Sequence, residues 1–324
     1  MKALVLAAAG AVEMRDEPEP RVSAGERLVH VRSTSICGSE LHGARTPGFR
    51  KPPLIMGHEF AGVTEEGDPV IVNPILSCGT CGLCRTGRRQ ICEQRRIIGV
   101  HRPGGFAERV AVPSSTLRPV PPGLTWEAAA LVEPAANAVH AWNLARAAAG
   151  ATAGPDGADG TGLPRVAVIG CGAIGLLCLL AALAGGAGSV DVTDLSAQRL
   201  TAARHLGATA AAAELDGEYD IVFDAVGSAE TRAESVLRQR PGGVAVWLGL
   251  AAAEAGFDAA ALVRSEKRVL GSFAYSDQDF GLASTLLAGW DLCWTSSYPL
   301  SSGAEVFTDL MNGALQPIKA VLQP

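Results

Sequence analysis

The sequence has no block of lysines and arginines, and no apolar run long enough to cross a membrane without interruption by glycine. Lysine and arginine number 27 against 33 aspartates and glutamates, a formal net charge of −6, so nucleic-acid binding is not expected. The longest apolar stretch, residues 165–187, opens with a strand-like run and contains several glycines. It predicts a buried strand and helix rather than a membrane span. Charged residues make up 19% and hydrophobic residues 48%, which excludes a disordered chain.

The sequence also has no clear cleavage site after its short apolar beginning, MKALVL, and acidic residues soon follow. We therefore expect a first β-strand there rather than a secretory signal. Four of the eight cysteines lie within fifteen residues, and three of them have C-x2-C spacing. This spacing favours a metal site over disulfides and is typical of a reducing cytosol, so a cytoplasmic protein is expected.

The chain length of 324 residues suits two domains. Residues 1–135 consist of short strand-like runs, such as 54–63, broken by Gly and Pro. An Ala- and Leu-rich helix is expected over 126–150, and a Gly/Ala/Pro-rich surface loop over 147–164.

From residue 165 onward strands alternate with helices, including a helix expected over 229–240. This alternation predicts a doubly wound parallel α/β sheet. We expect a nucleotide-binding domain at 141–271 and a β-rich domain at 1–140 and 272–324.

A cysteine ladder with the spacing C-x2-C-x2-C-x7-C is the strongest local motif. It consists of Cys78, Cys81, Cys84 and Cys92. Four thiolates within fifteen residues can close a tetrahedral zinc site with no open position, which is the pattern of structural zinc.

A G-x-G-x-x-G fingerprint, formed by Gly170, Gly172 and Gly175, follows a strand-like run and opens a predicted helix. The backbone there, through Ala173 and Ile174, can approach a pyrophosphate at the helix N-terminus. Asp194 ends the next strand, where its carboxylate would bind the adenosine ribose and repel a 2′-phosphate. This favours NAD over NADP, although Arg199 could reach the same ribose. Packing glycines with a surface aspartate are the alternative.

Cys37 and His58 lie upstream of the ladder and Glu133 lies downstream of it. A Cys, a His and one carboxylate leave a fourth position open, which is the pattern of a catalytic zinc. On these residues alone, a small buried cysteine and a structural histidine explain the pattern equally well. An acidic residue that favours the start of a helix is the alternative for Glu133.

The motifs ICGSELH, GHEFAG, the cysteine ladder, GVHRPGGFAE, EPAANAVHA, GCGAIG and IKAVL occur in one order along the chain. In this order they resemble the zinc-dependent medium-chain dehydrogenases/reductases, in particular the sorbitol and threonine dehydrogenase branch. The resemblance implies a Rossmann domain, a GroES-like catalytic domain with a zinc lobe, and two zinc ions per chain. It also implies NAD(P)-dependent interconversion of a secondary alcohol and its ketone.

The resemblance further implies roles for single residues. Cys37, His58 and Glu133 would be ligands of the catalytic zinc, with Glu59 able to approach or exchange onto it. Ser39 would contact the substrate oxygen, His42 would end its proton relay, and Lys319 would meet the cofactor pyrophosphate.

The implied substrate is a small polar alcohol: a polyol, cyclitol, sugar acid or amino-polyol. A threonine-like amino alcohol, a simple alcohol and a silent zinc- or NAD-binding regulator are the alternatives. A homodimer or homotetramer is expected, with no nucleic-acid or membrane partner.

The chain departs from the family at Glu40, where an aspartate is usual. That aspartate supports the metal-bound histidine, so the longer Glu40 is expected to alter zinc affinity. The alternative is that Glu40 is a solvated charge.

Overall fold

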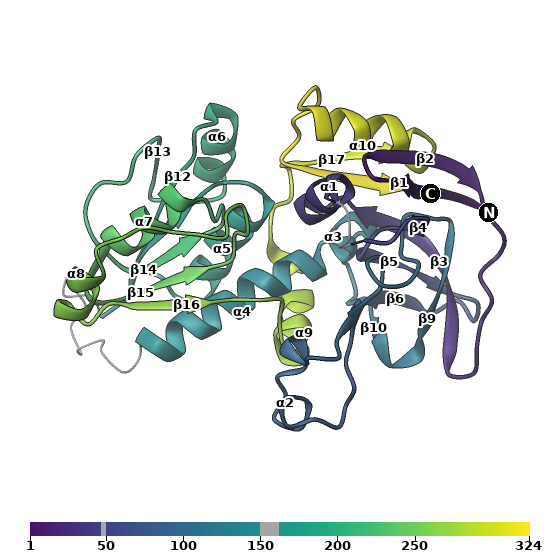
Figure 1. Ribbon diagram of the computed structural model, residues 1–324, viewed down its shortest axis with the longest axis horizontal. Coiled ribbons are helices and arrows are strands. Elements are labelled where there is room, and N and C mark those ends of the chain that lie inside the picture. The colour runs from purple at the N-terminus through teal and green to yellow at the C-terminus, as the bar shows by residue number, and fades with distance from the viewer. Residues whose placement is uncertain (47–49, 150–161) are drawn as a thin grey trace. The chain divides into compact units, whose positions relative to one another are not determined.

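The computed structural model describes residues 1–46, 50–149 and 162–324, which form two compact units (Figure 1). The first unit comprises Met1–Glu133 with Ser276–Pro324, and the second comprises Pro134–Tyr275. The boundaries expected after residues 140 and 271 lie a few residues from these.

The first unit is built on a seven-stranded sheet in the order β10-β6-β5-β3-β18-β17, with β9 also paired to β3. The strands are β3 (Glu26–Ser35), β5 (Glu59–Thr64), β6 (Pro69–Val72), β9 (Arg109–Pro113), β10 (Leu117–Pro119), β17 (Thr295–Pro299) and β18 (Lys319–Gln323). Side chains that point inward from β3, β5, β6 and β9 form one apolar core. Because β18 pairs antiparallel with β3, the C-terminal strand lies directly beside the strand that leads to Cys37.

A smaller sheet in the order β2-β1-β4 covers a second core in the same unit. Its strands are β1 (Lys2–Ala8), β2 (Ala11–Asp16) and β4 (Leu54–Ile55). Leu4 and Leu6 of β1 pack there with Phe106 and Phe307. The helices of this unit are α1 (Gly38–Arg45), α3 (Trp126–Ala130), α9 (Asp277–Leu286) and α10 (Gly303–Asn312), with short 3-10 turns at Ser114–Thr116, Leu287–Gly289 and Leu300–Ser302.

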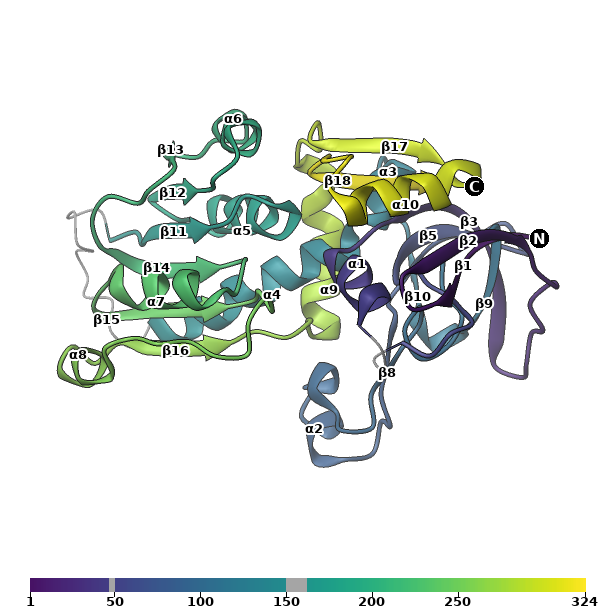
Figure 2. The same cartoon turned by 45° about the horizontal axis from the view of Figure 1, so that its top comes forward.

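The cysteine ladder forms a lobe that stands away from the main sheet of the first unit (Figure 2). Two short antiparallel strands, β7 (Ile75–Leu76) and β8 (Arg96–Ile97), form its base. Between them lie only the one-turn helix α2 (Gly82–Arg85) and the 3-10 turn η1 (Arg89–Ile91). The backbone hydrogen bonds of the segment between β7 and β8 are local turn contacts, such as Arg88 N to Leu83 O at 2.9 Å and Arg95 N to Cys92 O at 3.0 Å.

The second unit contains a six-stranded, all-parallel sheet in the order β13-β12-β11-β14-β15-β16. This is the 3-2-1-4-5-6 order of the dinucleotide-binding fold, and the predicted doubly wound sheet is confirmed. The strands are β11 (Arg165–Ile169), β12 (Ser189–Thr193), β13 (Ala210–Ala212), β14 (Tyr219–Asp224), β15 (Gln239–Trp247) and β16 (Arg268–Gly271). The helices are α4 (Val132–Ala149), which begins in the first unit, and α5 (Ala173–Ala184), α6 (Ala197–His205), α7 (Ala229–Leu237) and α8 (Ala259–Arg264).

Several predicted boundaries are wrong for local reasons. The strand expected over 54–63 is split into β4 and β5, because Gly57 adopts a left-handed φ of 95°. The helix expected over 126–150 divides at Leu131 into α3 and α4. The helix expected over 229–240 ends at Leu237, because Gln239 pairs with Tyr219 and starts β15.

Of the loop expected over 147–164, residues 147–149 belong to α4 and residues 150–161 lie outside the described part of the chain. Within the described residues, no helix is both long and apolar enough to cross a membrane.

Candidate active site

The four ladder cysteines converge, and their sulfur atoms all lie within 4.8 Å of one another. The Cys78–Cys84, Cys81–Cys92 and Cys92–Cys78 sulfur distances are 3.8, 3.9 and 3.6 Å. Four sulfurs bound to zinc at about 2.3 Å would form a tetrahedron with edges of about 3.8 Å. The lobe therefore holds its thiols at the spacing that a closed zinc site needs.

Backbone amides stabilise the thiolate form of Cys78. The N–H groups of Thr80 and Cys81 lower the pKa of Cys78 to about 6. The Cys81 amide lies 3.4 Å from the Cys78 sulfur. A metal ligand must be a thiolate, so these donors favour the ligand form of Cys78.

A second group of candidate ligands is assembled from separate segments. Donor atoms of Cys37, His58 and Glu59 lie within 4.8 Å of one another. Cys37 is the residue before α1, and His58 and Glu59 stand where β5 begins. The pairing of β3 with β5 places Ser35 opposite Glu59, and this register brings Cys37 near His58 across twenty residues of chain.

Glu40 holds both of the first two candidate ligands. Its Oε1 accepts hydrogen bonds from Gly57 N and His58 Nδ1, each at 2.9 Å. Its Oε2 accepts the amide of Cys37 at 3.0 Å. Glu40 is 0% exposed, so the alternative of a solvated charge is wrong. A carboxylate on one imidazole nitrogen orients the other nitrogen for a metal.

The charges of Glu40 and His58 stabilise each other. Burial opposes the ionised form of Glu40, but His58, together with the charge of Arg50 and the Cys37 amide, outweighs it and lowers the pKa of Glu40. Burial also opposes the imidazolium, yet Glu40 and Cys37 raise the pKa of His58 well above its ordinary value. The anionic surroundings thus favour a cation at His58, whether a proton or a metal ion.

Only one of the two carboxylate oxygens of Glu59 has a partner among the described residues. Its Oε2 accepts a short hydrogen bond from Ser35 Oγ and pairs with Lys319 Nζ at 2.6 Å. Its Oε1 is buried and has no hydrogen-bond partner in the described residues. A buried carboxylate oxygen without a partner is costly. This cost would be relieved by a cation beside Cys37 and His58.

Ser39 and His42 follow Cys37 on α1. The Ser39 hydroxyl lies 3.3 Å from the Cys37 sulfur, and both Ser39 and His42 are exposed. Residues three apart on a helix are neighbours, so a hydroxyl at the candidate metal site is followed by an imidazole open to solvent.

The glycine loop of the second unit has the close backbone approaches that its motif predicts. Gly170 has a φ of 91°, and a Cβ there would lie 2.4 Å from Val226 Cγ2. A Cβ on Gly175 would lie 1.7 Å from the Gly170 carbonyl oxygen. Gly172 precedes α5, whose first residues are Ala173 and Ile174, so these early amide groups face the loop end of the helix.

Asp194 is tied to the same loop at the end of β12. Its Oδ2 accepts the amide of Cys171 at 2.7 Å, and its Oδ1 accepts the amide of Ser196 at 2.8 Å. Arg199 Nη1 lies 3.6 Å from the Asp194 carboxylate. The expected acid and arginine therefore stand together beside the glycine loop.

Comparison with known proteins agrees with this arrangement. The alcohol dehydrogenase GroES-like domain matches residues 23–122, and the zinc-binding dehydrogenase family matches residues 173–289. An L-threonine 3-dehydrogenase of Streptomyces coelicolor is 33% identical, with 97% of each chain covered. The chain belongs to the zinc-dependent medium-chain dehydrogenase/reductase family.

Two further members of this family cover almost the whole chain. An L-galactonate-5-dehydrogenase of Escherichia coli K12 is 30% identical over 92% of this chain and 91% of that protein. The crystal structure of a zinc-binding dehydrogenase from Sinorhizobium meliloti 1021, bound to NADP, superposes with a TM-score of 0.88. It is 28% identical and covers 100% of this chain and 99% of that one. The predicted fold and enzyme class, an alcohol or polyol dehydrogenase of this family, are confirmed.

The donor groups of the dehydrogenase fit the two zinc ions that the sequence predicts. The sulfur spacing of the lobe suits a structural ion. The Cys37, His58 and Glu59 group, with its unengaged Glu59 oxygen, suits a catalytic ion.

The structure adds one observation on each of two further site residues, whose roles stay predictions. Glu133, at the start of α4 and 8% exposed, is not part of the group within 4.8 Å. Lys319, 5% exposed, forms an ion pair with Glu59. Burial disfavours its charge, but Glu59 raises its pKa. The IKAVL motif contains no signal for this partner, because only the β18–β3 pairing brings Lys319 close.

Proposed function

We propose that this dehydrogenase oxidises a secondary alcohol of a small polar substrate, or reduces the matching ketone, with a nicotinamide dinucleotide. The observation that carries the proposal is the convergence of Cys37, His58 and Glu59 on one point, with the Ser39 hydroxyl beside Cys37. A closed structural site has no need of an adjacent exposed hydroxyl. A site that must receive a substrate does.

In this proposal Cys37 and His58 hold the catalytic zinc, with a carboxylate completing the protein ligands. Glu59 offers its unengaged oxygen for that place, and Glu133 remains the predicted alternative or additional ligand. Zinc held there would supply Lewis acidity to the substrate hydroxyl. Glu40 keeps the Cys37 and His58 segments in register, so the ligand atoms need not reorganise during turnover.

Ser39 and His42 provide the path for the proton. The Ser39 hydroxyl can accept a hydrogen bond from the substrate oxygen and pass a proton on, and the exposed His42 can release it to water. Histidine suits this role because its pKa lies near neutrality.

The glycine loop would hold the dinucleotide, which supplies the hydride acceptor. Asp194 supports NAD as the preferred form, because its carboxylate would repel a 2′-phosphate. Arg199 tempers that repulsion from 3.6 Å, so NADP is the second choice.

The substrates named for two relatives support a polar substrate for this enzyme. Relatives at 33% and 30% identity are an L-threonine 3-dehydrogenase and an L-galactonate-5-dehydrogenase. Both act on molecules with several polar groups and a carboxylate. A sugar acid, polyol, cyclitol or amino-polyol is therefore the proposed substrate, with a threonine-like amino alcohol second and a simple alcohol third.

We also propose a homodimer or homotetramer in the cytoplasm. The strand β16 ends the parallel sheet and has β15 as its only strand neighbour among the described residues, and an edge strand is a ready surface for pairing with another chain. A reducing compartment would keep the eight cysteines unlinked, as all of them are here.

A substrate panel tests the function. Enzyme of measured zinc content would be assayed with NAD and with NADP on sugar acids, polyols, L-threonine and simple secondary alcohols. We expect turnover on the polar substrates, with NAD favoured. The absence of turnover on every alcohol by zinc-replete enzyme that still binds NAD would instead support the silent regulatory protein.

A further inference from the structure

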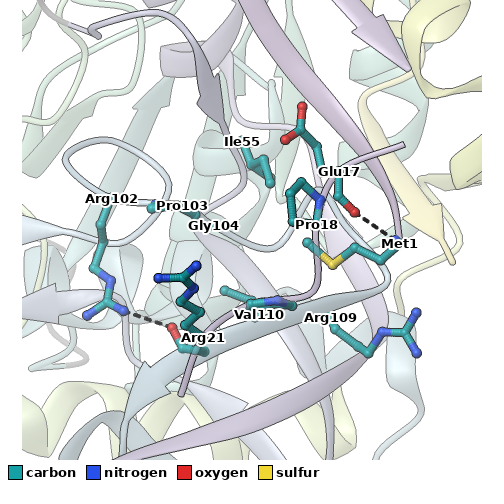
Figure 3. A pocket seen from close by; sticks show the side chains of 12 residues that line it. Met1, Glu17, Pro18, Arg21, Ile55, Arg102, Pro103, Gly104, Arg109 and Val110 are labelled. Atoms are coloured by element: carbon teal, nitrogen blue, oxygen red, sulfur yellow. Dashed lines mark hydrogen bonds between the residues drawn. The ribbon is translucent and has the colours of Figure 1, made fainter. Parts of the chain in front are cut away.

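A cavity of about 250 Å³ lies in the first unit, beside the segment that leads to His58 (Figure 3). Its walls are mainly apolar and include Met1, Pro18, Ile55, Pro103 and Val110. Ligand sites typically combine such walls with a few polar groups. None of the candidate zinc ligands, relay residues or glycine-loop residues lines this cavity.

Two of the three arginines that line the cavity already have anionic partners. Arg102 Nη2 pairs with Glu26 at 2.6 Å and donates to the Ala111 carbonyl at 2.9 Å. Arg109 pairs with Glu19 at 2.9 Å. Their charges are therefore balanced within the fold.

Arg21 is the exception. Its guanidinium extends into the cavity toward Pro103 (Figure 3) and has no ion-pair or hydrogen-bond partner in the described part of the chain. Glu17 also lines the cavity, but its carboxylate points away from Arg21 in the same view. The Met1 ammonium donates to the Glu17 carbonyl at 2.8 Å and lies 3.5 Å from Glu19. Arg21 is an exposed residue, so the cavity presents one positive charge without a counter-charge on its solvent-accessible side, next to apolar walls.

We propose that this cavity binds a small organic acid with a single carboxylate on an apolar body. A guanidinium matches a carboxylate through two parallel hydrogen bonds, and the proline, isoleucine and valine walls suit the apolar part. One free cation and about 250 Å³ do not suit a dinucleotide or another polyanion. The site is independent of the identity of the alcohol substrate.

The cavity wall is directly bonded to the segment that positions His58. Gly104 N donates to the Ile55 carbonyl at 2.9 Å, and both residues line the cavity. The next two amides form similar hydrogen bonds. Gly105 N donates to the Gly57 carbonyl at 2.8 Å, and Phe106 N donates to the Met56 carbonyl at 3.0 Å. No side chain fits at Gly104, where a Cβ would lie 2.1 Å from the Gly57 carbonyl oxygen. An occupant that contacts Ile55 and Gly104 therefore stabilises the backbone that carries a candidate metal ligand.

Calorimetric titration with benzoate tests the binding site. The zinc-replete wild-type enzyme, without dinucleotide, should bind benzoate saturably, and the neutral isostere benzamide should bind at least about tenfold more weakly. The Arg21→Gln variant should lose about tenfold in benzoate affinity, and Arg21→Lys should lose less. Arg32 is exposed on β3 and likewise has no partner in the described residues, so Arg32→Gln is the matched control and should bind as wild type.

Benzoate could instead bind at the catalytic zinc, and the variants separate the two cases. Equal affinity in wild type and Arg21→Gln, or the absence of binding to wild type, would overturn the proposal. Benzamide affinity equal to that of benzoate would also overturn it, because the charge would then play no part.

Hydrogen exchange tests the link to His58 without any assay of turnover. Benzoate should slow exchange at the amides of Gly57, Gly105 and Phe106 in wild type and in Arg32→Gln, but not in Arg21→Gln. If benzoate gives the same protection in Arg21→Gln, these amides respond to an anion bound elsewhere and the coupling is wrong.

Discussion

The two candidate zinc sites of this dehydrogenase are built in opposite ways. The four cysteines of the lobe come from one stretch of fifteen residues, with little regular structure between β7 and β8. The Cys37, His58 and Glu59 group comes from separate segments and is held by a buried carboxylate and a long-range sheet pairing. We therefore expect the first site to take much of its stability from bound zinc, whereas the second takes its geometry from strand pairing and a buried carboxylate.

The largest expected effect is in the lobe. Cys84→Ser removes one thiolate from a closed site, and binding energy at structural zinc is partly folding energy. We expect loss of about one zinc per chain together with poor solubility, measured by metal analysis and thermal unfolding. Cys178→Ala, at a cysteine outside every candidate metal group of the described residues, is the control and should keep both metals. A well-folded Cys84→Ser protein with two zinc ions would show that the lobe does not depend on four thiolates.

The second-largest effect is expected at the Cys37, His58 and Glu59 group, through the buried carboxylate of Glu40. Glu40→Gln keeps the size of the side chain but removes its charge, which weakens its bonds to His58 and Cys37. Zinc affinity or activity should fall about 10–100-fold while the protein stays folded, as measured by chelator competition and kcat/KM. Glu40→Asp restores the charge on a shorter side chain and should recover part of the loss. Wild-type zinc affinity in Glu40→Gln would mean that the backbone alone sets the ligand geometry.

Glu133→Ala tests which carboxylate serves the catalytic zinc. If Glu133 is a ligand, one zinc should loosen without unfolding and activity should fall at least about 10–100-fold, while NAD binding persists. If it only stabilises the start of α4, both zinc ions should remain and about 1 kcal/mol of stability should be lost. Metal counting on Glu133→Ala and Glu59→Ala side by side separates these outcomes. Two tightly held zinc ions and near-normal turnover in Glu133→Ala would remove Glu133 from the ligand set.

The smallest expected effect is in the second unit, where the glycine loop is local in sequence like the lobe. Asp194→Ala should raise kcat/KM with NADP relative to NAD by about tenfold or more, because it removes a like charge from the 2′-phosphate. The variant also loses the bonds to Cys171 and Ser196, so NAD use should fall at the same time. An unchanged ratio would place Asp194 away from the ribose.

Features formed by residues close together in the sequence were easier to predict than features assembled from separate segments. The parallel sheet was predictable because each strand and helix has its own periodic pattern, and the glycine loop because its spacing is local. The split of the 54–63 strand was not predicted, since it depends on the left-handed turn at Gly57 packed against Phe106. Likewise, nothing in the IKAVL motif indicates the ion pair of Lys319 with Glu59, whereas the contact of Lys319 with a cofactor pyrophosphate stays a prediction.

The sequence by itself determined the thiolate ladder, the dinucleotide loop with its acid, and the family, because these depend on residues that are neighbours along the chain. Only the tertiary structure decided that Glu40 is buried and bonds two candidate ligands, that Glu59 keeps one oxygen unengaged, and that Arg21 stands without a counter-charge. The physical reason is that burial and charge balance at one residue depend on partners brought together by strand register and loop packing. Sequence spacing does not encode those partners.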